Sequence, residues 1–201
     1  MSADDALGRL KEGNQRFRGG QARECALNRE EMVKLSKGQQ PFATILGCSD
    51  SRVAPEWIFD AALGELFVIR VAGNVLSPEV AGSLQYAGCH LRTPLFVVLG
   101  HEGCGAVHAA LATRDEGVIQ RSRIQILVDS ILPALPQFDA QVSADARLSQ
   151  SVEAGVRYTV QQIQQSPEGK VRMAEGVIRI IGAVYDLETG VVRWLEPVGK
   201  T

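Results

Sequence analysis

The sequence predicts an α/β fold, in which a mostly parallel central β-sheet is flanked by helices and carries an antiparallel strand at its C-terminal edge. Short, continuously apolar segments alternate with segments of helical periodicity, and this alternation is typical of parallel strands that are buried on both faces. Near the end of the chain, two apolar segments flank the turn residues Glu188, Thr189 and Gly190. That pattern predicts a hairpin, and therefore an antiparallel edge strand.

The first part of the chain is expected to be helical. Helical spacing of apolar residues and terminating glycines predict a helix over 3–18 and a shorter one over about 29–37. The apolar run 42–46 predicts the first buried strand. Pro55 is suited to the first turn of a helix, which we place over 55–62.

Two further strands are expected in the middle of the chain. Apolar runs over 66–71 and 95–99 predict them, and a helix that begins at Pro78 and extends through Arg92 separates them. Helical segments are expected over about 105–112 and 115–132, with prolines as breakers.

The last third of the chain completes the alternation. A long helix is predicted over 143–165, and a short one follows and ends at Glu175. The strand 177–185 and its antiparallel partner 191–195 then form the terminal hairpin.

Length and composition narrow the class of protein. With 201 residues, of which 45% are hydrophobic and 22% charged, the chain is expected to form a single domain over 1–201, with an N-terminal helical arm over about 1–38. A net charge of −2 without a long basic run indicates no nucleic-acid partner and no anionic membrane partner. The acidic N-terminus lacks the features of a secretory signal, and the longest apolar runs are strand-sized, so we expect a cytoplasmic protein.

Reactive side chains follow two of the predicted strands. Cys48, Asp50 and Arg52 come after the first strand, whereas His101 and Cys104 come after the third. In open α/β sheets, ligands bind outside the carboxyl ends of the strands, where such loops meet. A buried thiol, carboxylate and guanidinium each need a partner, although short Ser/Asp clusters also form ordinary turns.

The spacing of these residues suits a metal ion. If Gly100 begins a helix, His101 and Cys104 lie on one face of its first turn, and Cys48 supplies a third ligand from another strand end. One imidazole and two thiolates are suited to Zn²⁺ and leave the fourth tetrahedral position free. In a chain of this apparent location, four cysteines indicate metal-binding, catalytic or core residues rather than disulfides.

Asp50 has two possible arrangements beside such a metal. If it is paired with Arg52, it stays ionised and is held away from the metal; if it is unpaired, it can fill the fourth position. Zn²⁺ with two thiolates is formally neutral, so its water should be hard to deprotonate unless Asp50 assists. Activity should therefore favour neutral to alkaline pH.

Two motifs together resemble the β-class carbonic anhydrase family. They are C-S-D-S-R-V over 48–53 and H-x-x-C-G-A over 101–106, and the likeness extends to segments 67–70, 72–74 and 182–186. The resemblance implies one Zn²⁺ per subunit, held by Cys48, His101 and Cys104, and a dyad of Asp50 and Arg52. It also implies a CO₂ pocket lined by Gln39, Phe67, Tyr86 and Gly105, although Phe67 and Tyr86 could instead be core residues.

By this resemblance, the expected activity is the reversible hydration of CO₂ to bicarbonate and a proton, by attack of zinc-bound hydroxide. The family also implies a homodimer or a dimer of dimers, with pocket residues contributed across the interface and N-terminal helices lying over the partner. Two alternatives stay open: hydrolysis of COS or CS₂ on the same zinc, and a non-catalytic zinc- or bicarbonate-binding module in which Asp50 closes the coordination shell.

Some residues depart from the family pattern or invite a second interpretation. Ile45 stands where some bacterial members have a tryptophan associated with an inhibitory bicarbonate site, so we do not expect that regulation. Arg70, in an otherwise apolar strand, is expected to pair with Glu56 or Glu79.

Three further positions are expected to lie outside the site. Cys89 and His90 are adjacent on a helix and point apart, which favours a buried cysteine over a second metal pair. His108 is expected to be a capping or core residue rather than a proton shuttle. Cys25, in a polar stretch, has no expected role.

Overall fold

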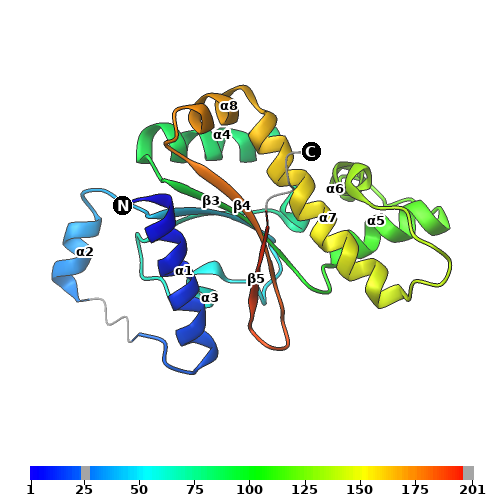
Figure 1. Ribbon diagram of the computed structural model, residues 1–201, viewed down its shortest axis with the longest axis horizontal. Coiled ribbons are helices and arrows are strands. Elements are labelled where there is room, and N and C mark those ends of the chain that lie inside the picture. Colours follow the sequence, from blue (N-terminus) through cyan, green and yellow to red (C-terminus); the bar gives the residue numbers. More distant parts are fainter. Residues whose placement is uncertain (24–27, 197–201) are drawn as a thin grey trace.

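A computed structural model describes residues 1–23 and 28–196 of the chain. Its centre is a five-stranded sheet with the strand order β2-β1-β3-β4-β5, in which the first four strands are parallel and β5 runs antiparallel to β4 (Figure 1). The strands are β1 (Ala43–Gly47), β2 (Leu66–Arg70), β3 (Leu95–His101), β4 (Arg179–Tyr185) and β5 (Val192–Leu195). The predicted fold class, including its antiparallel C-terminal edge strand, is confirmed.

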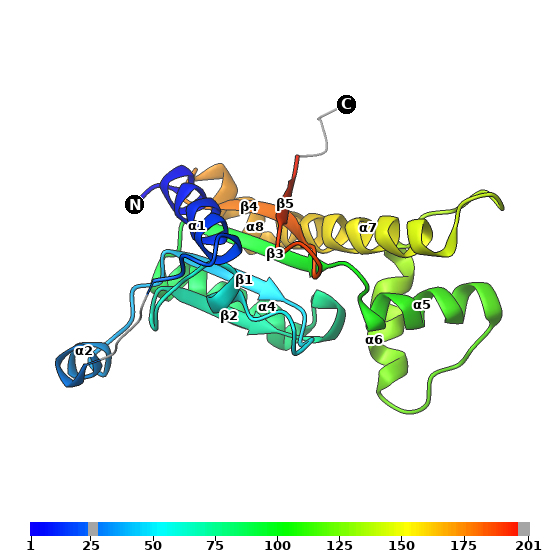
Figure 2. The same ribbon diagram turned by 90° about the horizontal axis from the view of Figure 1, so that it is seen from below.

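Helices cover both faces of this sheet. They are α1 (Ala3–Arg18), α2 (Arg29–Leu35), α3 (Pro55–Ile58), α4 (Pro78–Tyr86), α5 (Gly105–Glu116), α6 (Ile124–Ile131), α7 (Ala144–Gln165) and α8 (Pro167–Ala174). Figure 2 shows α5 and α6 beyond the ends of the strands, and α2 apart from the sheet. In the described part of the chain, none of the helices has the length and apolar character needed to span a membrane.

The two faces of the sheet form two separate hydrophobic clusters. On one face, Ile45 and Val97 pack with residues of α1 and α3 such as Leu10. On the other face, Leu46 and Val98 pack with residues of α4 and α7. Strands β1 and β3 are buried at every position, because each alternate side chain meets a helix layer.

The structure differs from the predicted helices at three places, in helix type at the first and in helix ends at the other two. The helix expected over 78–92 changes at Tyr86 into a single π-helical turn, which ends where Arg92 adopts a left-handed backbone with φ of 55°. The break expected near residue 113 comes later, because Gly117 ends α5 with φ of 69° and α6 begins only at Ile124. The helix expected over 55–62 is shorter, since Asp60 adopts φ of 46°.

Glycines let the long helix α7 approach the sheet. A methyl group on Gly100 would lie 2.5 Å from Val156 Cγ2, and one on Gly182 would lie 2.8 Å from Val156 Cγ1. Because neither glycine has a side chain, the fully buried Val156 packs directly on β3 and β4. Helix α7 therefore covers the sheet beside the end of β3.

Helix α1 is attached to its face of the sheet by a polar residue. The buried Asn14 amide donates to the carbonyl oxygens of Ile58, at 3.2 Å, and Gly190, at 2.9 Å, and its oxygen accepts from the Val192 N–H at 3.2 Å. Beside it, a methyl group on Gly13 would lie 1.9 Å from the Phe59 carbonyl oxygen. The helix thus packs against the chain after α3 at a distance that only glycine permits.

We predict that Gly13→Ala destabilises the protein although alanine is the better helix former. The helix-propensity gain is about 1 kcal/mol, whereas overpacking against a backbone oxygen costs about 1–3 kcal/mol. Gly8→Ala in the same helix is the matched control, because a methyl group there meets nothing within 4 Å. Urea unfolding should show a lower midpoint for Gly13→Ala and an equal or higher one for Gly8→Ala; equal midpoints for both variants would contradict the packing argument.

Candidate metal centre and active site

A tight turn after β1 carries the first group of predicted site residues. Cys48 directly follows the last residue of β1, and its side chain is buried. The Val53 N–H donates to the Asp50 carbonyl oxygen at 3.0 Å, and the Arg52 N–H donates to Asp50 Oδ1 at 3.0 Å. The ordinary turn chemistry of Asp is therefore present at Asp50, and the turn holds Asp50 and Arg52 beside each other.

Asp50 and Arg52 form a bidentate ion pair. Arg52 Nε donates to Oδ1 at 2.9 Å, and Arg52 Nη2 donates to Oδ2 at 2.8 Å. These hydrogen bonds from Arg52 hold the pKa of the Asp50 carboxyl well below its usual range, although partial burial opposes the shift. Of the two arrangements considered for Asp50, the structure has the paired one, with Oδ2 3.9 Å from His101 Nε2.

The end of β3 differs from the predicted local structure. Gly100 does not begin a helix, because it and His101 continue β3 by pairing with Val184 and Tyr185 of β4. The chain then turns at Gly103, which has φ of 67°, and Cys104 is the N-cap residue of α5. His101 and Cys104 therefore come from a strand end and a helix start rather than from one helical face.

Cys48, His101 and Cys104 nevertheless meet in a buried cluster. Their potential ligand atoms all lie within 4.8 Å of one another. His101 Nδ1 lies 2.9 Å from the Glu102 carbonyl oxygen, which can only accept, so the imidazole donates its proton there. This leaves the lone pair of Nε2 toward the cluster, and Nε2 is buried without a hydrogen-bond partner.

The two thiols of the cluster differ in acidity because their sulfurs face each other. The pKa of Cys48 is lowered because the Cys104 thiol donates a hydrogen bond to its sulfur, and the same interaction raises the pKa of Cys104. The Gly73 N–H also donates to Cys48 Sγ, at 3.4 Å. Two buried thiols that face each other, together with an unpartnered imidazole nitrogen, are a donor set that fits Zn²⁺.

Two contacts to the turn after β1 were not foreseen. The first is the hydrogen bond from Gly73, which belongs to the segment 72–74 of the family resemblance; a glycine in the loop that leaves a strand is the sequence signal for such a close backbone approach. The pairing of Arg70 with Glu56 or Glu79 is wrong. Arg70 instead donates to the carbonyl oxygens of Cys48, at 2.9 Å, and Asp50, at 2.5 Å, because β2 lies beside β1 and its end reaches the turn.

The four residues expected to line a CO₂ pocket lie at exposed or half-buried positions. Gln39, before β1, is exposed, and so is Gly105, which directly follows Cys104. Phe67 of β2 and Tyr86 of α4 contact each other, with ring centroids 6.0 Å apart, and Tyr86 is 47% exposed. In the described residues, no hydrogen bond or ion pair links these side chains to the cysteines and histidine of the cluster.

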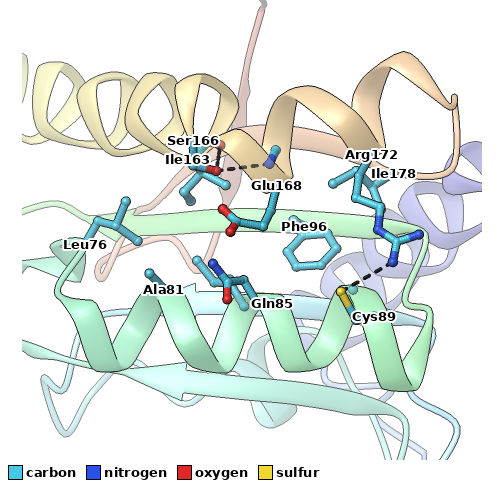
Figure 3. A pocket seen from close by; sticks show the side chains of 13 residues that line it. Leu76, Ala81, Gln85, Cys89, Phe96, Ile163, Ser166, Glu168, Arg172 and Ile178 are labelled. Atoms are coloured by element: carbon cyan, nitrogen blue, oxygen red, sulfur yellow. Dashed lines mark hydrogen bonds between the residues drawn. The ribbon is translucent and has the colours of Figure 1, made fainter.

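The expectation that Cys89 is buried is wrong. Cys89 and His90 are both exposed, because the π-helical turn keeps Ala87 on the buried side and directs Cys89 toward α8. There Arg172 Nη2 donates to Cys89 Sγ at 3.3 Å. This pair lies at the edge of a small apolar cavity between α4, α8 and β3, whose volume is about 50 Å³. Figure 3 shows the side chains that line it.

His108 is not a core residue either. It is exposed, and Val107 and Leu111 occupy the buried face of α5. Cys25 lies outside the described residues.

Comparison with known proteins places this arrangement in a family. Residues 43–192 match the family model described as carbonic anhydrase. The chain belongs to the carbonic anhydrase family. It is 38% identical to carbonic anhydrase 2 of Mycobacterium tuberculosis over 182 residues, which cover 90% of this chain and 87% of that protein. It is 37% identical to a carbonic anhydrase of Mycolicibacterium smegmatis, with 94% and 92% of the two chains covered.

The fold shows the class within the family. The β-carbonic anhydrase of Coccomyxa superimposes with a TM-score of 0.74 at 29% identity and covers 94% of this chain and 86% of its own. The chain is therefore an enzyme of the β-class carbonic anhydrases, as its two motifs predict.

We predict that metal binding depends on the buried cluster. Cys104→Ser and His101→Ala should each lower the affinity for Zn²⁺ more than about 100-fold, because losing even an outer partner of a ligand costs 10–100-fold. Cys89→Ser is the control, since its thiol is exposed and bonded to Arg172. Elemental analysis should find one zinc per subunit in the native chain and in Cys89→Ser; stoichiometric zinc in both ligand variants would refute the ligand set.

Proposed function

We propose that this enzyme catalyses the reversible hydration of CO₂ to bicarbonate and a proton, with one Zn²⁺ per subunit. Cys48, His101 and Cys104 would hold the ion. The observation that carries the proposal is the buried cluster, whose unpartnered His101 Nε2 lies 3.9 Å from an ionised Asp50 oxygen. When bound, Zn²⁺ supplies a Lewis acid that lowers the pKa of a coordinated water.

Asp50 would orient the attacking water. Its carboxylate stays ionised because Arg52 donates to both oxygens, and an ionised carboxylate accepts a hydrogen bond from the water without holding a proton of its own. Arg52 therefore acts through Asp50. Since Asp50 Oδ2 lies beside the cluster, the oriented water would face both the metal ligands and the entering CO₂.

The substrate pocket would be formed by Gln39, Phe67, Tyr86 and Gly105. CO₂ is small, linear and without net charge, so an apolar surface and one amide donor suffice to hold it. Gly105 leaves open space beside Cys104, because a methyl group there would meet nothing within 4 Å. The exposure of Tyr86 and Gln39 in a single chain supports a pocket that a second subunit completes.

The paired Asp50 argues against the non-catalytic alternative. A permanently closed coordination shell would need the Asp50 carboxylate to leave Arg52 and move to the metal, whereas the bidentate pair holds the carboxylate in the turn. Hydrolysis of COS or CS₂ uses the same machinery, and a comparison of initial rates on the three substrates distinguishes it from CO₂ hydration.

We predict that stopped-flow assays of the zinc-loaded enzyme detect CO₂ hydration that rises from acidic to alkaline pH. A neutral zinc–dithiolate core makes the water hard to deprotonate. Asp50→Asn should keep zinc and lower kcat by about 10²-fold, the usual scale of general acid–base assistance. Asp129→Asn, on the exposed side of α6, is the control and should keep native turnover. Absence of hydration at every pH despite full zinc occupancy would instead favour the binding module.

A homodimer is the smallest assembly that we propose. Helix α2 buries none of its residues, and its Met32 and Val33 are 60% and 48% exposed. Strand β2 is an edge strand whose outer backbone groups are unpaired in the sheet, and its first four residues are only half buried. A second copy of the chain would cover both features, as the family resemblance implies for the N-terminal helices.

We predict that Met32→Lys weakens this assembly. On the surface of a monomer, a substitution changes the free energy of unfolding by no more than about 0.5 kcal/mol. In a dimer, a lysine that is buried at the interface without a partner favours dissociation of the subunits. Light scattering should give the dimer mass or a multiple of it for the native chain, and a smaller mass at low concentration for Met32→Lys. Ile119→Lys, at a position that is 81% exposed, is the control and should keep the native mass; a monomeric native chain would contradict the proposal.

A further inference from the structure

Arg70 holds the backbone of the turn that carries Cys48 and Asp50. It is the last residue of β2, and it lies opposite Gly47 in the parallel pairing of β1 and β2. From there, Nε donates to the Cys48 carbonyl oxygen at 2.9 Å and Nη2 donates to the Asp50 carbonyl oxygen at 2.5 Å. The next residue, Val71, donates its N–H to the Gly47 carbonyl oxygen at 3.1 Å. The end of β2 thus binds carbonyl groups at three positions of the turn.

The two arginines of this region act on different parts of Asp50. Arg52 binds the carboxylate, whereas Arg70 and the Val53 N–H bind the main-chain carbonyl oxygen. The position of the Asp50 carboxylate therefore depends on contacts to both the side chain and the main chain of this residue. The same guanidinium also binds the main-chain carbonyl oxygen of Cys48, so Arg70 connects the backbone of a candidate metal ligand to the backbone of Asp50.

We propose that Arg70 is a positioning residue, which sets Asp50 relative to the metal ligands by bridging two carbonyl oxygens on either side of Ser49. The inference rests on the proposed function for its effect on turnover, but not for the bridge itself. A planar guanidinium offers two donors in a fixed fork, and hydrogen bonds from a charged donor are about twice as strong as neutral ones. A lysine ammonium carries all its donors on one nitrogen and cannot bind the two carbonyl oxygens in the same planar geometry.

The test uses Arg70→Lys and Arg70→Gln in the full-length, metal-loaded enzyme. Both variants should keep about one zinc per subunit. Their kcat should fall about tenfold or more with little change in KM, because Arg70 would affect the geometry of the transition state and not the binding of the substrate. Arg179→Gln, an exposed arginine at the opposite end of β4 that pairs with Asp4, is the matched control. A kcat within twofold of native for both Arg70 variants would overturn the proposal.

A double-mutant cycle separates positioning from general damage to the fold. In an Asp50→Asn background, Arg70→Gln should lower kcat by less than about twofold, because its effect acts through Asp50. An equal loss in both backgrounds would mean that Arg70 is merely structural. If Arg70→Gln gives no folded protein, Arg70→Lys takes its place in the cycle, and a native kcat for that variant overturns the inference.

The visible absorption of bound Co²⁺ tests the role of Arg70 without an activity assay, and so separately from the proposed function. With Co²⁺ in place of Zn²⁺, Arg70→Lys should shift the visible bands of the bound metal and speed its release to a chelator, since Cys48 is less firmly held; Arg179→Gln should do neither. If the native enzyme shows no CO₂ hydration, the proposed function fails, and the cobalt bands still decide whether Arg70 positions the turn. Unchanged bands and release rates would reject the bridge.

Discussion

The close approach of two thiols and one imidazole in a buried place is the constraint on which the rest of the structure depends. Two buried cysteine sulfurs within 4.8 Å of each other cannot both carry a charge without a cation, and an imidazole nitrogen buried without a partner adds a smaller cost of its own. The surrounding turns are arranged to tolerate this. The Gly73 N–H donates to one sulfur, and the Glu102 carbonyl fixes the tautomer of the imidazole. The free energy of metal binding would then stabilise an arrangement that opposes folding in its absence.

The parallel sheet explains how residues far apart in sequence satisfy that constraint. Cys48 directly follows β1 and His101 is the last residue of the adjacent strand β3, and the carboxyl ends of parallel strands lie at one edge of the sheet. Strand β2, on the other side of β1, brings Arg70 and Gly73 to the same edge. The buried strands therefore fix the site, and Gly100 and Gly182 let α7 pack close behind it.

The sequence predicts the sheet and the three residues of the metal-binding cluster, because both are encoded in short continuous segments of the chain. Short continuous apolar runs that are bounded by glycine or proline are typical of buried strands, and the C-S-D-S-R-V and H-x-x-C-G-A motifs are specific as a pair. The errors concern features that depend on neighbours in space. Gly100 lies in β3 rather than in a helix because β4 pairs with it, and Arg70 binds carbonyl oxygens rather than a carboxylate because β1 ends beside it. Burial of Cys89 could not be judged either, because a π-helical turn has no clear sequence signal.

The hydrogen bond from Gly73 to the Cys48 sulfur has a consequence for mutational surveys. Its donor is a main-chain N–H, which every amino acid except proline retains, so a scan that truncates side chains does not remove it. A substitution at Gly73 would instead destabilise the protein, because the backbone φ is 71° and an added methyl group would lie 2.7 Å from Ile131 Cδ1. The scan would therefore record Gly73 as a packing residue. Replacing the amide by an ester at this peptide bond removes the donor without adding a side chain, and is the substitution that measures how much the backbone N–H stabilises a charge on the sulfur.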